Sequence, residues 1–229
     1  MARTFTLGTL VTRAKQRADM ENATFIADAE WKGIVSSAYA ELFSLLAASG
    51  LRYFESVDTV TTDGSAAYAL PADFLSSIGV DYVVNAQGSR RQLEELMAQE
   101  RNLYTGASSS GEAVAYSLVG TDLTFYPTPP TSQDYEHRYI PQPADLSDSA
   151  DGTSVDVVTP DGEQFLIWYA AVMALSKEES DVRVAMAERE RFRQRVEEWA
   201  VLRSLHSPRR LIVDEGGYSD PADFRRGSW

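Results

Sequence analysis

Histidine, the side chain best suited to acid–base chemistry near neutral pH, occurs only twice in this 229-residue chain, as His137 and His206. His137 stands between Glu136 and Arg138 in a strand-like stretch, and His206 follows the last helical stretch. Neither has a partner at the spacing that a metal site or a hydrolytic triad uses. We therefore interpret both as exposed polar side chains, and the sequence predicts no catalytic residue.

Carboxylates are abundant, with 34 Asp and Glu in the chain. Asp145, Asp148 and Asp151 precede Gly152, but their spacing misses the alternation of a calcium loop and lacks its closing glutamate. General acid–base work needs carboxyl groups that converge in a cleft, and nothing in the sequence picks out such a pair. We predict no metal, no cofactor and no enzymatic activity, while cation binding by the loop 145–152 stays open.

Four alternating arginines form the other conspicuous charged motif: Arg189, Arg191, Arg193 and Arg195. Alternate residues of a helix diverge by about 200°, so these side chains do not form one stripe, and glutamates interleave with them. The pattern indicates a salt-bridged face exposed to solvent or to another subunit. The net charge of −13 makes the chain a poor candidate for binding nucleic acid. An acidic surface can instead let DNA pass without adhering.

Cysteine is absent from the sequence, which excludes disulfides, thiolate metal sites and cysteine catalysis. No apolar run approaches the roughly 18 residues that a transmembrane helix needs. The N-terminus lacks the apolar segment of an ordinary secretory signal. We therefore expect a protein that is made in a cytoplasm and does not enter a membrane.

Helical periodicity dominates the N-terminal stretch. Residues 6–20 carry an apolar stripe, and Thr6 is the expected N-cap of that helix. A longer stripe runs over 28–49, where Asp28 is the expected cap and Gly50 the expected stop. Both stripes predict helices that bury one face in a core.

A second pair of helices is expected near the C-terminus. Thr159, followed by Pro160 and an aspartate, is typical of a helix start, because the threonine caps and the proline fits the first turn. The last helix is expected over 181–204, with ion pairs such as Arg193–Glu197 and Glu190–Arg193 on its exposed face.

The middle third alternates between apolar and polar residues, which predicts strands over 54–62, 66–70, 78–84, 114–119, 123–126 and 135–140. Asp63-Gly64 and Gly120-Thr121 predict hairpin turns. Pro71 stops the strand that ends at Leu70, and Asp73 suits the start of a short helical turn. Between these strands, Arg91–Tyr104 is predicted to be a helix.

These elements together predict an α+β fold that is mainly α, with a core like a four-helix bundle, a small antiparallel sheet as an insertion and an extended C-terminal tail. The expected organisation is a helical core from 1–52 and 158–206, a β-rich insertion over 53–157, and a docking tail over 207–229.

The tail differs from an ordinary disordered terminus because it is rich in aromatic and β-branched residues. Such segments commonly order on a partner, as an added strand or through aromatic anchors. Packing back onto the tail's own domain is the alternative. The candidate docking residues are Leu211, Ile212, Val213, Tyr218, Phe224 and Trp229.

Taken in order, these elements resemble the head-to-tail adaptor (connector, or head-completion) proteins of tailed bacteriophages over roughly residues 5–205. The resemblance rests on the N-terminal helix pair with Ala38-Tyr-Ala-Glu-Leu42, on Tyr68-Ala-Leu-Pro-Ala-Asp-Phe74, and on the hairpin at Tyr116–Pro127. It also includes the strand Tyr135–Ile140 and the helix with Tyr169-Ala-Ala-Val-Met-Ala174.

The resemblance implies a structural virion protein and no enzyme. Copies of it would form a ring, commonly twelvefold, between the portal and the tail, and would extend the channel through which DNA passes without specific binding. The C-terminal segment would dock onto the portal protein, and tail or neck proteins would bind below. The protein would be assembled in the host cytoplasm and end at the portal vertex of the virion. The alternatives are another neck or tail-completion protein and a carboxylate-based virion hydrolase.

Overall fold

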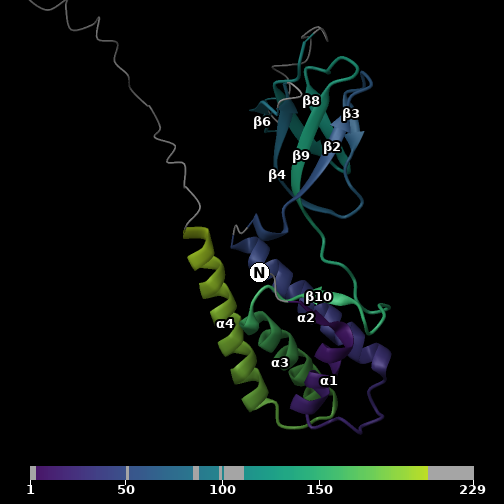
Figure 1. The fold of residues 1–229 in the computed structure, drawn as a ribbon, viewed down its shortest axis with the longest axis vertical. Helices are drawn as coiled ribbons and strands as arrows, with labels where there is room; N and C mark the ends of the chain where they lie inside the picture. The colour runs from purple at the N-terminus through teal and green to yellow at the C-terminus, as the bar shows by residue number, and fades with distance from the viewer. Residues whose placement is uncertain (1–3, 50–51, 85–87, 98–99, 101–110, 206–229) are drawn as a thin grey trace, which may run out of the picture.

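Four helices surround the main core at one end of the molecule (Figure 1). The computed structural model describes residues 4–49, 52–84, 88–97, 100 and 111–205. Its helices are α1 (Leu7–Arg17), α2 (Asp28–Ala48), α3 (Pro160–Lys177) and α4 (Arg183–Leu205), and a short 3-10 turn, η1 (Arg52–Phe54), follows α2. Helix α3 lies at the centre and packs against the other three helices.

The sequence predicted the N-caps of three helices, and the structure confirms two of them. The side chain of Thr6 accepts a hydrogen bond from the amide of Thr9, and that of Thr159 accepts one from Gly162 at 2.9 Å. Both predicted N-caps are therefore confirmed. Helix α2 differs, because its N-cap is Ala27, which has no capping side chain. Asp28 is instead the first helical residue and forms an ion pair with Lys15.

The predicted stripes form the main hydrophobic core. Every helix contributes side chains that are almost fully removed from solvent, among them Leu10, Trp31, Leu42, Phe165, Leu166 and Val196. A two-stranded antiparallel sheet of β1 (Thr4–Thr6) and β10 (Ser154–Asp156) closes one side of this core. This small sheet joins the N-terminus to the segment that leads into α3.

Two further sheets pack face to face as a sandwich at the other end of the molecule (Figure 1). The first has the order β2 (Ser56–Thr61), β9 (Asp134–Pro141), β4 (Phe74–Val83) and β5 (Arg90–Gln92). The second has the order β3 (Ala67–Ala69), β8 (Asp122–Tyr126), β7 (Ala115–Val119) and β6 (Glu94–Glu95). Phe125 and Tyr135 meet between the sheets, with ring centroids 4.5 Å apart.

The mainly helical fold class predicted from the sequence is wrong. Of the described residues, 41% are helical and 26% lie in strands, and the strands form three sheets of four, four and two. The strands make a sandwich with its own aromatic core, whereas the prediction had a minor sheet attached to a helical bundle. The number of strands in a sequence does not show how they pair, and here their pairing produces two packed sheets instead of one small sheet. Two sheets that share a buried interior form a separate layer architecture.

The predicted hairpin at Asp63-Gly64 is also wrong, although the turn itself is present. Gly64 adopts a positive φ of 93°, but β2 on one side of it pairs with β9, while β3 on the other side pairs with β8. Thr62 continues the pairing of β2 through its amide, which donates to the carbonyl of Gln133. The turn therefore passes the chain from one sheet to the other.

Pro71 ends its strand as predicted, and the chain then returns to the first sheet. The amide of Phe74 donates to the carbonyl of Pro71 in a tight turn between β3 and β4. No helical turn starts at Asp73, whose carboxylate instead accepts a hydrogen bond from the hydroxyl of Tyr139 at 3.0 Å.

The helix predicted over Arg91–Tyr104 is contradicted where the structure describes it, because Arg90–Gln92 and Glu94–Glu95 are strands. Strand β5 pairs with β4, and β6 lies parallel to β7. Pairing with two neighbours thus outweighs the helix-favouring composition. The hairpin around Gly120-Thr121 is confirmed, since Val119 of β7 pairs with Asp122 of β8.

The sandwich is attached through neighbouring strands. Strand β2 follows η1 directly, β9 leads back towards the helices, and Ser56 of β2 is the Cα partner of Tyr139 of β9. The entry and exit of the sandwich therefore lie side by side. This arrangement suits an insertion into the helical part, and the domain limits given above remain a prediction.

Candidate interaction surfaces

All six predicted docking residues, together with Gly50 and His206, lie outside the described residues. The structure therefore tests neither the role of Leu211, Ile212, Val213, Tyr218, Phe224 and Trp229 nor the alternatives for the tail. What it does describe is the surface from which that segment continues and the remaining surfaces of the helices and the sandwich.

A junction of polar and aromatic side chains holds the end of α4. The hydroxyl of Tyr53, in η1, donates to a carboxylate oxygen of Asp156 at 2.7 Å. Burial and this hydrogen bond raise the pKa of Tyr53 to about 12, so the phenol stays protonated and keeps donating. The guanidinium of Arg203 lies 4.9 Å from the ring centroid of Tyr53 and 5.4 Å from that of Trp199. Arg203 therefore links the last turn of α4 to η1, and Tyr53 links η1 to β10.

The four alternating arginines of α4, at positions 189, 191, 193 and 195, each have an acidic partner. Arg193 contacts Glu197 at 3.3 Å and Glu190 at 3.7 Å, which confirms the two pairs predicted from the sequence. The other three partners are Glu41 for Arg189, Glu188 for Arg191 and Asp161 for Arg195. These exposed or half-exposed pairs contribute little stability each, but together they offset the positive charge of the four arginines.

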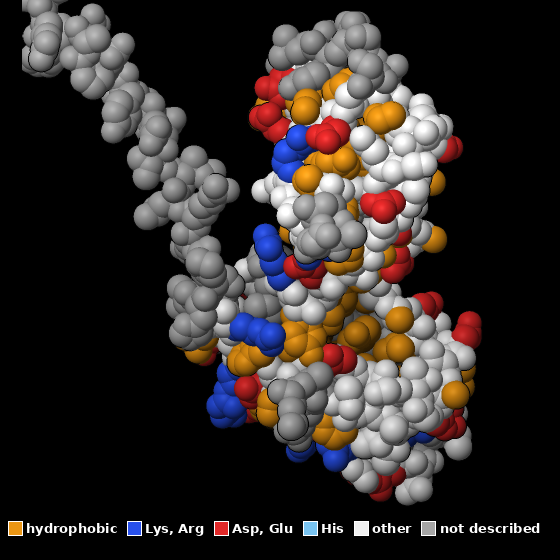
Figure 2. Space-filling view, turned by 45° about the horizontal axis from the view of Figure 1, so that its top comes forward, with side chains coloured by type: hydrophobic (Ala, Val, Ile, Leu, Met, Phe, Trp, Pro, Cys, Tyr) orange, Lys and Arg blue, Asp and Glu red, His pale blue; other side chains and the backbone are white. Residues whose placement is uncertain are grey.

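Charges of both signs are interspersed over the molecule. Figure 2 shows acidic and basic side chains scattered over one face, with no continuous basic band among the residues coloured there. A surface of this kind lacks the clustered lysines and arginines that neutralise a phosphate backbone.

The outer end of α4 carries an open groove that combines carboxylates with apolar side chains. Gln194, Glu197, Glu198, Val201 and Leu202 line it. Val201 and Leu202 are 51% and 61% exposed, which is high for large apolar residues of a helix. The inner face of the same helix is buried at Val196 and Ala200, so the groove faces away from the core.

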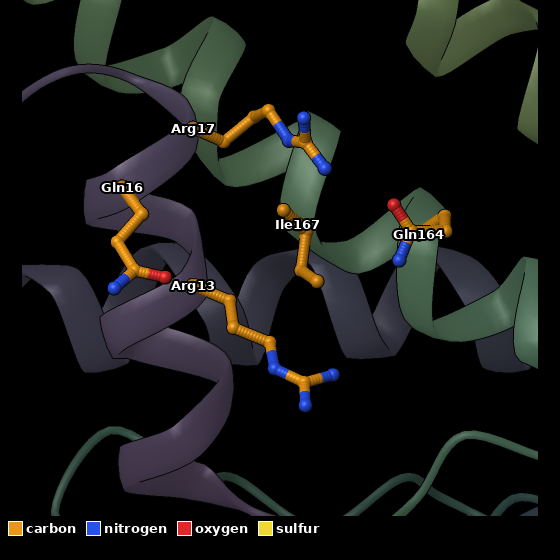
Figure 3. Close-up of a pocket in the computed structure, with 5 residues that line it drawn as sticks. All are labelled: Arg13, Gln16, Arg17, Gln164 and Ile167. Atoms are coloured by element: carbon orange, nitrogen blue, oxygen red, sulfur yellow. The ribbon is translucent and has the colours of Figure 1, made fainter.

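A second groove lies between α1 and α3 (Figure 3). Arg13, Gln16 and Arg17 reach it from α1, Gln164 reaches it from α3, and the buried Ile167 of α3 forms part of its lining. The guanidinium of Arg17 lies 4.9 Å from the ring centroid of Trp168, and no carboxylate pairs with it among the described residues. The groove is therefore basic and rich in hydrogen-bond donors.

Arg13 in this groove pairs with Glu163, which is almost fully buried at the start of α3. The sequence interpretation missed this groove because its two helices are about 150 residues apart. Arg13 and Arg17 stand at i and i+4, so they share one face of α1. This pair of like charges was the one signal in the sequence that indicated a basic surface on α1.

The outer face of the first sheet carries a network of charges centred on Arg138. Its guanidinium contacts Glu55 at 2.9 Å, Asp81 at 3.1 Å and Glu136 at 3.3 Å. Arg90 also pairs with Glu136, and that hydrogen bond is the main reason that the pKa of Glu136 is lowered. Every member of this network has an opposite charge beside it, so the network fits a stabilising role on the sheet surface.

The expectation that His137 is exposed is wrong. His137 is 1% exposed on the inner face of β9, and its ring stacks on that of Tyr139 with centroids 5.6 Å apart. Its Nε2 lies 3.1 Å from the hydroxyl of Ser77, while Nδ1 has no hydrogen-bond partner among the described residues. Burial lowers the pKa of His137, so the residue is a neutral core side chain.

The acidic loop before α3 is occupied by structural contacts. Asp145 accepts hydrogen bonds from the amide of Ser147 and the hydroxyl of Ser36, each at 2.9 Å, and these lower the pKa of its carboxyl group. Asp151 pairs with Lys32 at 2.8 Å. Within the described part of the chain, no group of three or more metal-ligating side chains is assembled, and no helix is long and apolar enough to span a bilayer.

The chain matches a known protein family. A family model described as the SU10 adaptor protein matches residues 5–211. The match extends from β1 through both sheets and all four helices to the beginning of the segment after α4. No curated protein matches the sequence significantly.

Proposed function

The chain belongs to the SU10 adaptor protein family, and from that premise we propose that its copies form a ring between the portal and the tail of a tailed phage. The family is one of phage head-to-tail adaptors, so the chain is a structural adaptor protein of a virion, which confirms the resemblance inferred from the sequence. The ring, its attachment to the portal and the passage of DNA are what we propose beyond that.

The family match is the observation that carries the proposal, and the surfaces described above support it. The four alternating arginines of α4 are paired with acidic side chains, and the chain has a net charge of −13. A channel built from such subunits would repel the DNA backbone instead of binding it. DNA could then move through the ring without specific contacts.

Attachment to the portal is assigned to residues 207–229. Arg203 links the last described turn of α4 to Tyr53, which is hydrogen-bonded to Asp156, so this segment continues from a helix end that contacts the rest of the core. Its aromatic and β-branched residues provide anchors of the kind that dominate protein interfaces.

The first test is the mass of the purified chain alone and after mixing with the portal protein of the same genome, measured by mass photometry. A complex that gains about twelve copies is expected from the proposed ring. A chain that stays unbound at every concentration would overturn the portal position and favour a tail-completion role, which binding to the purified tail would then establish.

The second test removes residues 207–229. We expect the truncated chain to lose portal binding while its circular dichroism and thermal unfolding stay unchanged, because the described core ends before the deletion. A matched control replaces the same segment with a Gly/Ser sequence of equal length. Portal binding by either variant at the wild-type level would show that docking does not depend on this segment.

A further inference from the structure

We propose that neighbouring subunits meet head to tail, with the acidic and apolar outer groove of α4 seated on the basic α1/α3 groove of the next copy. This inference rests on the proposed ring, and it names the two surfaces that would build it. A ring of identical chains needs two different surfaces that fit each other, because a patch that binds itself closes a dimer.

The first surface is one side of a long helix. Helix α4 has 23 residues and buries only the face that packs on α3 and α2, so at about 1.5 Å per residue it presents roughly 35 Å of outer face. Val201 and Leu202 supply exposed apolar area near its end. Glu198 adds a carboxylate with no ion pair to any described residue.

The second surface has the complementary chemistry. Arg17 supplies a guanidinium that lacks a carboxylate partner in the described part of the chain, and Gln16 and Gln164 supply amide donors beside it. In Figure 3 the side chains of Arg13 and Arg17 extend from α1 towards α3, on either side of Ile167. Guanidinium groups pair with carboxylates through two parallel hydrogen bonds, which gives such a contact direction as well as attraction.

The placement of the two grooves suits a ring. Helix α3 lies between α1 and α4 in the bundle, and the α4 groove faces away from α3 because the opposite side of the helix is buried on it. A neighbouring copy on one side can therefore occupy the α4 groove of a subunit while the α1/α3 groove of the same subunit stays accessible to the copy on the other side. DNA is a poor occupant of the α4 groove, since Glu197 and Glu198 line it.

A crosslinking experiment uses the absence of cysteine from the full chain. A tagged chain with Gln194→Cys is mixed with an untagged chain with Gln16→Cys and treated with a short thiol-specific crosslinker, alone and on the portal. Each variant treated by itself is the matched control. We expect crosslinked pairs of one tagged and one untagged chain, and about tenfold fewer pairs in either control, because the two faces of a head-to-tail contact differ.

Charge reversal provides the second measurement. Glu198→Arg and Arg17→Glu should each lower the crosslink yield about tenfold, since they oppose like charges across the contact. Combining the two reversals should restore the yield. Glu94→Arg makes the same change in charge on the exposed strand β6 and should leave the yield unchanged.

The outcomes separate the two proposals. Assembly on the portal without crosslinks between positions 194 and 16, or with crosslinks between two copies of position 194, would overturn the interface and leave the ring intact. Equal losses with Glu94→Arg, or no rescue in the double variant, would also overturn the interface. A wild-type chain that stays monomeric alone and with the portal would overturn the ring and the interface together.

Discussion

Two helical glycines should respond in opposite ways to the same substitution. Gly162 lies in the first turn of α3, and a Cβ placed on it would lie 2.2 Å from the carbonyl oxygen of Val157. Gly33 lies inside α2, and a Cβ there would meet nothing within 4 Å apart from its chain neighbours and the backbone of its own helix. Replacing glycine by alanine inside a helix ordinarily raises stability by roughly 0.5–1 kcal/mol, because the unfolded chain loses conformational freedom.

The magnitude at Gly162 follows from the clash. Ordinary contacts of a Cβ begin near 3.4 Å, so the start of α3 or the backbone at Val157 would have to move by about an ångström. Overpacking of this kind costs about 1–3 kcal/mol. The movement would also strain the cap, in which the amide of Gly162 donates to Thr159 at 2.9 Å. We therefore expect Gly162→Ala to lower the free energy of unfolding by about 1–3 kcal/mol even after the helix-propensity gain.

Thermal unfolding followed by circular dichroism at 222 nm measures both variants. For a chain of this size, about 1 kcal/mol shifts the midpoint by roughly 2–4 °C. Gly33→Ala should raise the midpoint by about that amount or less, while Gly162→Ala should lower it by several degrees. Equal stabilisation by the two substitutions would refute the close approach of α3 to Val157.

Three other substitutions test the fold. Thr159→Ala should lower the free energy of unfolding by about 1 kcal/mol, because α3 loses its N-cap. Urea denaturation measures this, and the same substitution at the exposed Thr12 is the control, which should have a smaller effect. The pKa of His137 is lowered in the folded chain, so the unfolded chain binds a proton more readily than the folded chain, and stability should fall as the pH drops below about 6.5. His137→Gln should therefore reduce the change in the urea midpoint between pH 7 and pH 5.5. A change in midpoint as large as that of the wild type would contradict the burial of His137. Arg138→Gln should lower the free energy of unfolding by about 1–2 kcal/mol, because three carboxylates lose a shared cation. Added salt should make this loss smaller, and a loss that is the same at high salt would argue against an electrostatic cause.

Local signals in the sequence were reliable where neighbours along the chain decide the structure. Thr6 and Thr159 were identified as caps because a cap depends on residues three positions away. The hairpin at Gly120-Thr121 was found because its two strands pair with each other. At Asp63-Gly64 the same signal failed, since the flanking strands pair with β8 and β9, more than 50 residues away.

Composition was misleading where pairing between distant strands decided the outcome. Residues 91–97 favour a helix by composition, but the edges of β4 and β7 offered partners for Arg90–Gln92 and Glu94–Glu95. The surfaces followed the same rule. The Arg/Glu pairs within α4 were predictable from spacing along one helix, whereas the groove of Arg17 and Gln164 required knowing that α1 lies beside α3.

The side-by-side attachment of the sandwich has a mechanical consequence. Both connections leave from the same end of the paired strands β2 and β9, so tension between the helices and a partner gripping the sandwich would run along the strand axes. Strand β9 is hydrogen-bonded on one side to β2 and on the other to β4. This force would act in shear on the hydrogen bonds that join β9 to β2 and on those that join β9 to β4. Both rows of hydrogen bonds would have to break at once before β9 could slide, so the sandwich would transmit the force to the helices before it unfolded.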